Sequence, residues 1–199
     1  MRKIVLLLFL SGFLQSIKAQ STEDFTQHDF AYSYGVVTSN QIINVLTDIA
    51  VAIVSFGNVE RELQGFSGGH FLTYEYRAMD QLSFAFCGGI DKAHGNLLDP
   101  DDIIRGSYRN FYTTIGIATR FRYVDREWVQ MYSGIGLAYT FYGYKDLLDT
   151  GEISRSDILS YPNMQFNIWS IRVGKSFGGF MELGVGYKGI LNFGISYQL

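Results

Sequence analysis

The last nine residues, Leu191-Asn-Phe-Gly-Ile-Ser-Tyr-Gln-Leu199, alternate between two kinds of side chain. Odd-numbered positions are apolar or aromatic, whereas even-numbered positions are small or polar. Because successive side chains of a β-strand point to opposite faces, this alternation predicts a strand with one apolar face. The same pattern recurs earlier in the chain, within 30–37, 82–91, 111–123, 129–141 and 181–187.

The alternation predicts eight strands, near 29–37, 65–77, 81–91, 108–123, 127–142, 163–174, 179–187 and 190–199. A soluble sandwich also alternates, so the pattern alone does not decide between the two classes. Apart from the tight final hairpin, however, long and short connections alternate, with the long ones near 38–64, 92–107 and 143–162. Outer-membrane barrels have short periplasmic turns and longer external loops. We therefore expect an all-β fold, an eight-stranded antiparallel transmembrane β-barrel with both termini in the periplasm.

Residues 40–56 do not follow the two-residue period. Ile42, Ile43, Leu46, Ile49, Ala50 and Ile53 recur at helical spacing, and Ser39 or Asn40 is suited to cap a helix start. The second half, 49–56, is also compatible with a strand, but a ninth strand would break the even count. We therefore expect a short helix in the first external loop, resting on the barrel rim or docking a partner.

The N-terminus has the features of a secretion signal. Arg2 and Lys3 precede an apolar run from Ile4 to Leu14, and the small residue Ala19 follows as a cleavage point. That apolar run is too short to span a bilayer, which needs about 20 residues. The expected division is a signal peptide over 1–19 and a barrel domain over 20–199.

The composition excludes several other classes. Hydrophobic residues make up 47%, charged residues only 18%, and the formal net charge is −3, which argues against disorder and against a nucleic-acid binder. Cys87 is the only cysteine, so neither an internal disulfide nor a four-cysteine zinc site can form. Acidic groups at Asp99, Asp101, Asp102, Asp146, Asp149 and Glu152 match no metal-binding loop motif, and we expect no metal and no cofactor.

Four charged residues fall on the predicted inward face: Glu75, Arg120, Arg172 and Glu182. Each lies within a few residues of a predicted periplasmic turn, so all four should share one level of the barrel. Opposite charges that are buried together satisfy each other, whereas a lone buried charge is costly. We expect a polar plug in the periplasmic half; the alternative is four solvated charges at a wide mouth.

The opposite face is predicted to contact outer-membrane lipid. It carries no charge on the strands near 108–123, 127–142, 179–187 and 190–199. Six aromatic residues near strand ends suit the girdles at membrane interfaces: Tyr74, Tyr76, Tyr123, Tyr139, Phe141 and Tyr197.

The signal segment, the eight alternating stretches and the segments Arg172–Tyr187 and Gly184–Leu199 resemble the small outer-membrane β-barrels of Gram-negative bacteria. The chain is similar to the eight-stranded transmembrane domain of outer membrane protein A. This resemblance implies recognition of the last strand by the outer-membrane assembly machinery. Members of the family usually end in an aromatic residue, whereas this chain ends in Leu199 with Tyr197 two positions before it.

The expected role is structural or interactive, through the external loops and an unidentified external partner, without catalysis and without nucleic acid. One alternative is a lipid-modifying enzyme, for which His70 is the candidate base; its strand neighbours Ser67 and Thr73 fall on the opposite face. A second alternative is a secreted soluble ligand-binding barrel of the lipocalin kind. The predicted interior of Gly, Ser, Arg and Glu makes a poor apolar pocket for such a ligand.

Overall fold

The computed structural model describes residues 27–54, 60–98, 103–148 and 153–199. The predicted signal peptide, 1–19, lies outside these described residues. Nine strands and one helix follow one another in the described part: β1 (His28–Val36), α2 (Ser39–Val54), β2 (Glu60–Phe66), β3 (Gly69–Arg77), β4 (Leu82–Leu98), β5 (Ile104–Asp125), β6 (Val129–Leu148), β7 (Ile153–Gly174), β8 (Phe177–Gly186) and β9 (Leu191–Gln198).

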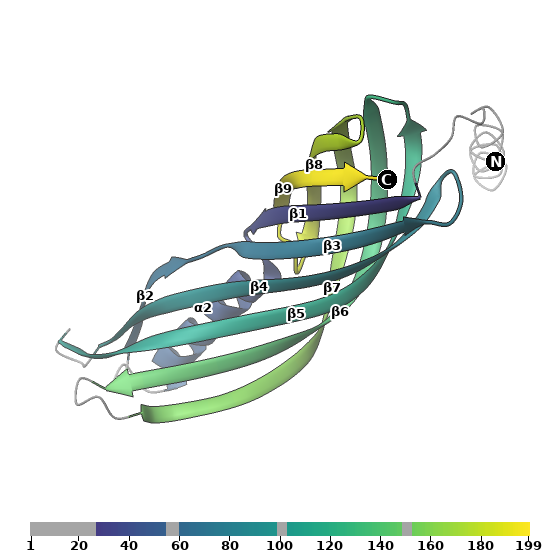
Figure 1. Ribbon diagram of the computed structural model, residues 1–199. Helices are drawn as coiled ribbons and strands as arrows, with labels where there is room; N and C mark the ends of the chain where they lie inside the picture. Colours follow the sequence, from purple (N-terminus) through teal and green to yellow (C-terminus); the bar gives the residue numbers. More distant parts are fainter. Residues whose placement is uncertain (1–26, 55–59, 99–102, 149–152) are drawn as a thin grey trace, which may run out of the picture.

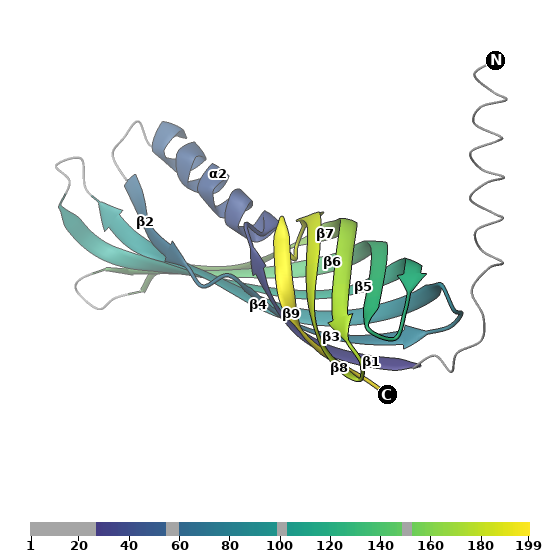
Figure 2. The same ribbon diagram turned by 90° about the horizontal axis from the view of Figure 1, so that it is seen from above.

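Eight of the strands form a closed antiparallel barrel (Figures 1 and 2). Its order is β1-β3-β4-β5-β6-β7-β8-β9, and β9 pairs with β1 to close the ring. The start of β1 meets the end of β9, where the His28 and Leu199 backbones exchange two hydrogen bonds of 3.1 and 2.8 Å. The prediction of an all-β, eight-stranded antiparallel barrel is confirmed.

The predicted strand over 65–77 is wrong in its first part, because the strand is interrupted at Ser67 and Gly68. Gly68 has a φ of 73°, which most side chains disfavour. The residues before this interruption form β2, which pairs with the last part of β4, where Phe66 is opposite Ala93. Both β2 and β3 therefore pair with β4, and β2 is a ninth strand that stands outside the closed ring.

The two long loops predicted near 92–107 and 143–162 are also wrong, because these residues belong largely to strands. β4 and β5 stay paired from Leu82 opposite Phe121 to Leu98 opposite Ile104. In the same way, β6 and β7 stay paired through the predicted loop residues. The strands thus run past the ring as an open sheet (Figure 2). We call this sheet the extension: β2 with 91–98 of β4, 104–112 of β5, 142–148 of β6 and 153–159 of β7.

The expected helix after the first strand is confirmed as α2, which lies against one face of the extension (Figure 2). The N-terminal cap of this helix is Thr38, and the prediction of Ser39 or Asn40 is wrong. The Gln41 backbone N–H donates to Thr38 Oγ1 at 3.2 Å, and the Thr38 N–H donates to Gln41 Oε1 at 3.1 Å, which is a reciprocal capping box. Within the described residues, no helix is long and apolar enough to cross a membrane.

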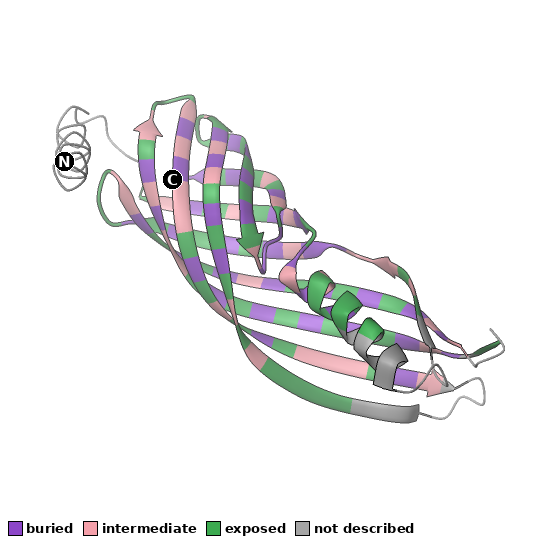
Figure 3. Ribbon diagram, turned by 180° about the vertical axis from the view of Figure 1, so that it is seen from behind, coloured by how far each residue is buried: buried purple, intermediate pink, exposed green. Residues whose placement is uncertain are grey.

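Buried and exposed residues alternate along the barrel strands (Figure 3). On β4, Phe84 and Phe86 are exposed whereas Ser83, Ala85 and Cys87 are buried, as the period of two predicts. Tyr187 is an exception: it was assigned to the apolar outer face but is fully buried. The reason is that β8 ends at Gly186, whose φ of 142° turns the chain and carries the next side chain inward.

Candidate functional site

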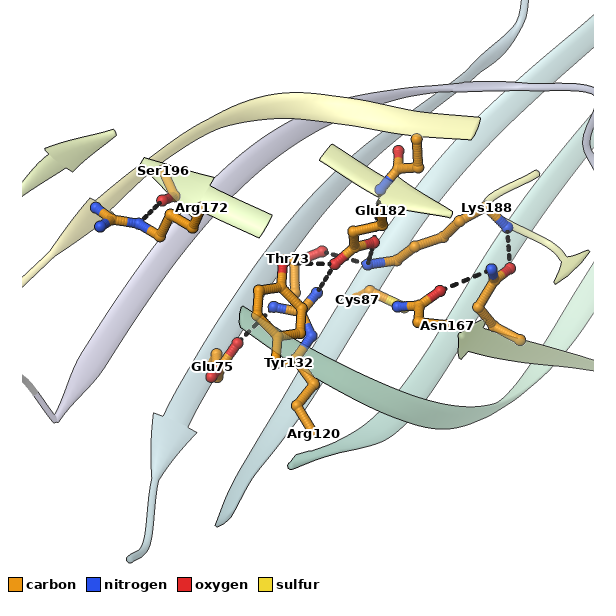
Figure 4. Close-up of polar contacts among 12 residues, drawn as sticks. Thr73, Glu75, Cys87, Arg120, Tyr132, Asn167, Arg172, Glu182, Lys188 and Ser196 are labelled. Atoms are coloured by element: carbon orange, nitrogen blue, oxygen red, sulfur yellow. Dashed lines mark hydrogen bonds and ion pairs between the residues drawn. The ribbon is translucent and has the colours of Figure 1, made fainter. Parts of the chain in front are cut away.

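A cluster of buried charges spans the barrel interior (Figure 4). Arg120 of β5 donates from Nη1 to Glu75 Oε2 of β3 at 2.5 Å and from Nη2 to Glu182 Oε1 of β8 at 2.8 Å. All three side chains are at most 6% exposed. We call these residues, with Arg122, the central charge cluster. Three of the four charges that the sequence assigned to the interior therefore meet in one cluster.

The central charge cluster has one member that was not among the four predicted inward charges. Arg122, also on β5, pairs with Glu75 Oε1 and donates to Ser83 Oγ at 3.3 Å. Arg122 lies two positions after Arg120, so the same alternation that places Arg120 on the inward face also places Arg122 there, although it does not reveal its role.

Glu182 is the most extensively bonded carboxylate of the cluster. It accepts from Tyr132 Oη at 2.9 Å and from Asn192 Nδ2 at 2.8 Å, and Lys188 Nζ lies 3.9 Å from its Oε2. Arg120 stacks over Tyr132, with its Cζ 5.0 Å from the ring centroid. Each lone pair of this buried carboxylate thus faces a donor, which offsets the cost of removing it from water.

Arg172, the fourth predicted member, lies inside the barrel but has different partners. Its Nε donates to Ser196 Oγ at 2.7 Å, and its guanidinium donates to the backbone carbonyls of Gly174, Lys175 and Ser176 at 2.7 to 3.2 Å. The nearest carboxylate in an ion pair with it is Asp29, at 4.0 Å. Arg172 therefore fastens the β7–β8 turn instead of joining the two glutamates.

Further polar pairs fill the barrel between the central charge cluster and the end of the barrel where β1 begins and β9 ends. Gln198 Nε2 donates to Asp29 Oδ2 at 2.8 Å and to Gln130 Oε1 at 3.0 Å. Arg77 Nη1 donates to Asp125 Oδ2 at 2.9 Å. The internal cavities that border these groups and the central charge cluster are about 10 Å³ or less, at or below the smallest volume that holds one water molecule.

On the other side of the cluster lies a small apolar layer of Phe71, Cys87 and Tyr187. The Tyr187 hydroxyl lies 3.2 Å from Cys87 Sγ. Two glycines make room for this ring: a Cβ on Gly136 would meet the Tyr187 hydroxyl at 2.8 Å, and one on Gly116 would meet it at 3.2 Å. The absence of side chains at these two inward glycines thus gives space to the bulky ring of Tyr187.

The helix α2 docks on the extension through polar side chains. Asn44 Oδ1 accepts from Tyr112 Oη at 3.1 Å and from Asn110 Nδ2. Asn40 Oδ1 accepts from Tyr161 Oη at 2.9 Å. At the start of the helix, Thr38 Oγ1 donates to buried Asp91 Oδ2 at 2.5 Å. The asparagines of α2 therefore face the sheet, and its apolar residues Ile42, Val45, Leu46 and Ile49 face away from it.

The candidate residues for catalysis do not assemble. His70 Nδ1 lies 2.7 Å from the Tyr32 hydroxyl, while Ser67 Oγ donates to the Gly68 carbonyl. Thr73 is buried and accepts from Lys188 Nζ at 3.3 Å. Within the described residues, no three His, Cys, Asp or Glu side chains are grouped as metal ligands. Of the acidic loop residues, Asp99, Asp101, Asp102, Asp149 and Glu152 lie outside the described part.

No family model matches the chain, and no curated protein sequence matches it. A solved structure with a similar trace is that of Ail, the attachment invasion locus protein of Yersinia pestis. It is 11% identical, with a TM-score of 0.41, and the likeness covers 87% of this chain and 97% of that chain. Likeness at this level says nothing about function, because one fold hosts many functions.

Proposed function

We propose that the chain is an integral outer-membrane β-barrel with a closed or very narrow lumen and a non-enzymatic role at the cell surface. One observation carries this proposal: the barrel is apolar outside and charged inside. Ile117 and Leu137 on the outer face are 63% and 58% exposed, while Glu75, Arg120 and Glu182 inside are at most 5% exposed. A water-soluble protein buries its apolar residues, whereas a barrel in lipid turns them outward.

The interior supports a closed lumen. Eight strands leave an interior that side chains can fill, and here the central charge cluster crosses it from β3 through β5 to β8. The cavities beside the cluster measure about 10 Å³, near the smallest volume that holds one water molecule, which supports a lumen without a water path at that level. The expected conductance in a planar bilayer is therefore at most a small leak.

The extension is the proposed working surface. It projects beyond the ring and presents α2 and the outer ends of five strands (Figure 1). Exposed elements placed on a rigid scaffold are typical of binding surfaces. The partner they contact is external and unidentified, and we propose no nucleic acid because the charge balance is acidic.

The orientation follows from the same proposal. The connections at 78–81, 126–128 and 175–176 lie at the end of the barrel where His28 meets Leu199, and the extension projects beyond the opposite end (Figure 2). In outer-membrane barrels short turns face the periplasm and the longer segments face outward, so the start of β1 and the end of β9 would both be periplasmic. The outward residues of β9, namely Phe193, Ile195 and Tyr197, would be the surface read by the assembly machinery.

The soluble ligand-binding alternative fits the structure poorly. A lipocalin-like barrel needs an apolar cavity inside, whereas the spaces beside Arg120 and Tyr132 are about 10 Å³ and polar-lined. The lipid-modifying alternative fits poorly as well, because no Ser or Cys side chain is hydrogen-bonded to His70 in the described residues. Loss of a measured lipid hydrolysis on H70A would revive the enzymatic alternative.

The decisive experiment is electrophoresis of the detergent-purified chain with and without boiling, together with cell fractionation. A folded barrel resists the detergent and changes its mobility only when it is boiled. We expect a clear shift and recovery in the outer-membrane fraction. Recovery of the folded chain from detergent-free periplasmic extract, without such a shift, would contradict the proposal.

A further inference from the structure

A row of basic side chains crosses the outer face of the extension. His94 of β4 pairs with Arg109 of β5, which in turn pairs with Lys145 of β6. One row nearer the ring, Lys92 pairs with Phe111, and its Nζ lies 5.6 Å from the centre of that ring. All four basic side chains are exposed. We call Lys92, His94, Arg109 and Lys145 the basic row.

On the same outward face of β4 and β5, nearer the ring, lies an apolar groove whose lining also comes from β1, β3, β8 and β9. Its floor is Gly88, which pairs with Leu72 of β3 and Ile115 of β5. A Cβ on Gly88 would meet no atom within 4 Å, so the missing side chain leaves a hollow between large neighbours. The groove has a volume of about 880 Å³, and its walls include Tyr32, Leu72, Tyr74, Phe86, Ile90 and Ile115.

The two features are close enough for one ligand to contact both. Gly88 and Lys92 are four residues apart on β4, which corresponds to roughly 13 Å along a strand. Ile90 lies between them on the same face. A molecule with an apolar chain over Gly88 would therefore bring a polar head to the level of Lys92 and Arg109.

The charge of the basic row specifies the head group. Within the described residues no carboxylate forms an ion pair with Lys92, Arg109 or Lys145; Glu62 stands at the edge of this face, opposite Asn96. Guanidinium and ammonium groups bind phosphate oxygens with charge-assisted hydrogen bonds. A face that changes from apolar to basic within two rows matches the boundary between acyl chains and phosphate groups in a bilayer leaflet.

We propose that the groove and the basic row together bind one phosphorylated lipid of the outer leaflet. One acyl chain lies over Gly88, and the phosphate contacts Lys92, Arg109 and Lys145. This inference rests on the proposed function, since it assumes that the barrel stands in a membrane. It goes further in naming the lipid class and the residues that select it, which a uniform layer of surrounding lipid would not require.

The test is native mass spectrometry of the mature chain in detergent micelles with two competing lipids, diphosphorylated lipid A and the same lipid without its phosphates. We expect the wild-type chain to retain the phosphorylated lipid preferentially. The double variant R109Q/K145Q should bind that lipid about 30-fold more weakly, since each cation near a membrane surface contributes a factor of about five to six and the two factors multiply. Its affinity for the dephosphorylated lipid should not change.

A second variant separates chain binding from head-group binding. A Cβ at position 88 would meet no atom within 4 Å, so the leucine of G88L should occupy the hollow and weaken both lipids by the same factor. Matched controls lie at the other end of the barrel: R126Q/K175Q removes one Arg and one Lys, and G179L adds a side chain at another outward position where a Cβ meets no atom closer than 3.8 Å. Both controls should bind as the wild type does. Millimolar inorganic phosphate should not displace the lipid, because it has no chain for the groove.

Equal retention of the two lipids by the wild-type chain would overturn this inference, as would undiminished selectivity in R109Q/K145Q. Displacement by inorganic phosphate alone would reduce the site to an anion site and overturn the lipid assignment. Insertion into vesicles is measured first, on the same samples. A chain that fails to insert contradicts the proposed membrane function, whereas one that inserts without selecting the phosphorylated lipid contradicts only the lipid site.

Discussion

Arg120 and Glu182 form an ion pair of 2.8 Å across the barrel interior, although β5 and β8 are not neighbours in the ring. The pair therefore joins two walls that no backbone hydrogen bond connects. Removing one member of such a pair leaves the other charge buried and uncompensated, which is more costly than the loss of the pair itself.

The variant E182Q tests this pair. It keeps the shape of the side chain but removes the charge that faces Arg120 and Lys188. We expect the free energy of unfolding, measured by urea titration in lipid vesicles, to fall by about 3–5 kcal/mol. The control is E127Q, whose ion pair with Lys175 is about half exposed and should contribute about 0–1 kcal/mol. Equal effects of the two variants would contradict a structural role for the interior charge.

The variant L137R tests whether the outer face meets lipid. Leu137 lies between Ile117 and Met164 on the outer face of the ring, and an arginine near the bilayer midplane costs about 2–4 kcal/mol. Ile103 is equally exposed, at 58%, but lies between the ends of β4 and β5, beyond the ring. We therefore expect I103R to be close to neutral in the same vesicle titration. In water the two variants would behave alike, so a neutral L137R would argue against the membrane.

The variant N44L tests the attachment of α2. Asn44 accepts hydrogen bonds from Asn110 and Tyr112, and a leucine would remove the acceptor that these two buried donors share, at a cost of about 1–3 kcal/mol. We expect faster hydrogen exchange in α2 and unchanged exchange in the ring strands. The control L46A changes a residue that is 59% exposed on the opposite side of the helix and should leave exchange in α2 unchanged. If N44L exchanges as the wild type does, the polar contacts do not hold the helix.

The thiol of Cys87 reports on the closed interior. It is buried against Tyr187, and burial shields a thiol from reagents dissolved in water. A water-soluble maleimide should modify Cys87 only as fast as the barrel unfolds. The control S176C/C87S places the only thiol at an exposed position in the β7–β8 turn and should be modified at once. Rapid modification of Cys87 in the folded wild-type chain would indicate a water path through the lumen.

The sequence predicted the ring but not the extension, and the outer face explains the difference. Within the ring, Phe84 and Phe86 alternate with small or polar residues, and the period of two is easily seen. Beyond the ring the same outward positions carry Lys92 and His94. The apolar residues Ala93 and Leu97 lie on the opposite face there, so the pattern of apolar outward positions ends, although backbone pairing continues to Leu98.

The interior shows a similar division. Alternation placed Glu75, Arg120, Arg172 and Glu182 on the inward face, because each of them lies on the strand face opposite the apolar residues. The alternation could not show which partner each of these charged side chains binds. Arg172 satisfies its guanidinium with backbone carbonyls of the β7–β8 turn, while Arg122 joins Glu75 instead. Such choices depend on distances across the barrel, which no spacing along one strand contains.

By itself, the sequence determined the fold class, the eight strands of the ring, the helix after the first strand and the face on which each charge lies. These follow from local periodicity, since the side-chain direction in a strand or helix repeats along the chain. Only the tertiary structure decided which residues meet, such as Arg120 with Glu182 and Asn44 with Tyr112. The physical reason is that barrel closure and strand register bring together residues that are remote in sequence, and register is a property of paired strands.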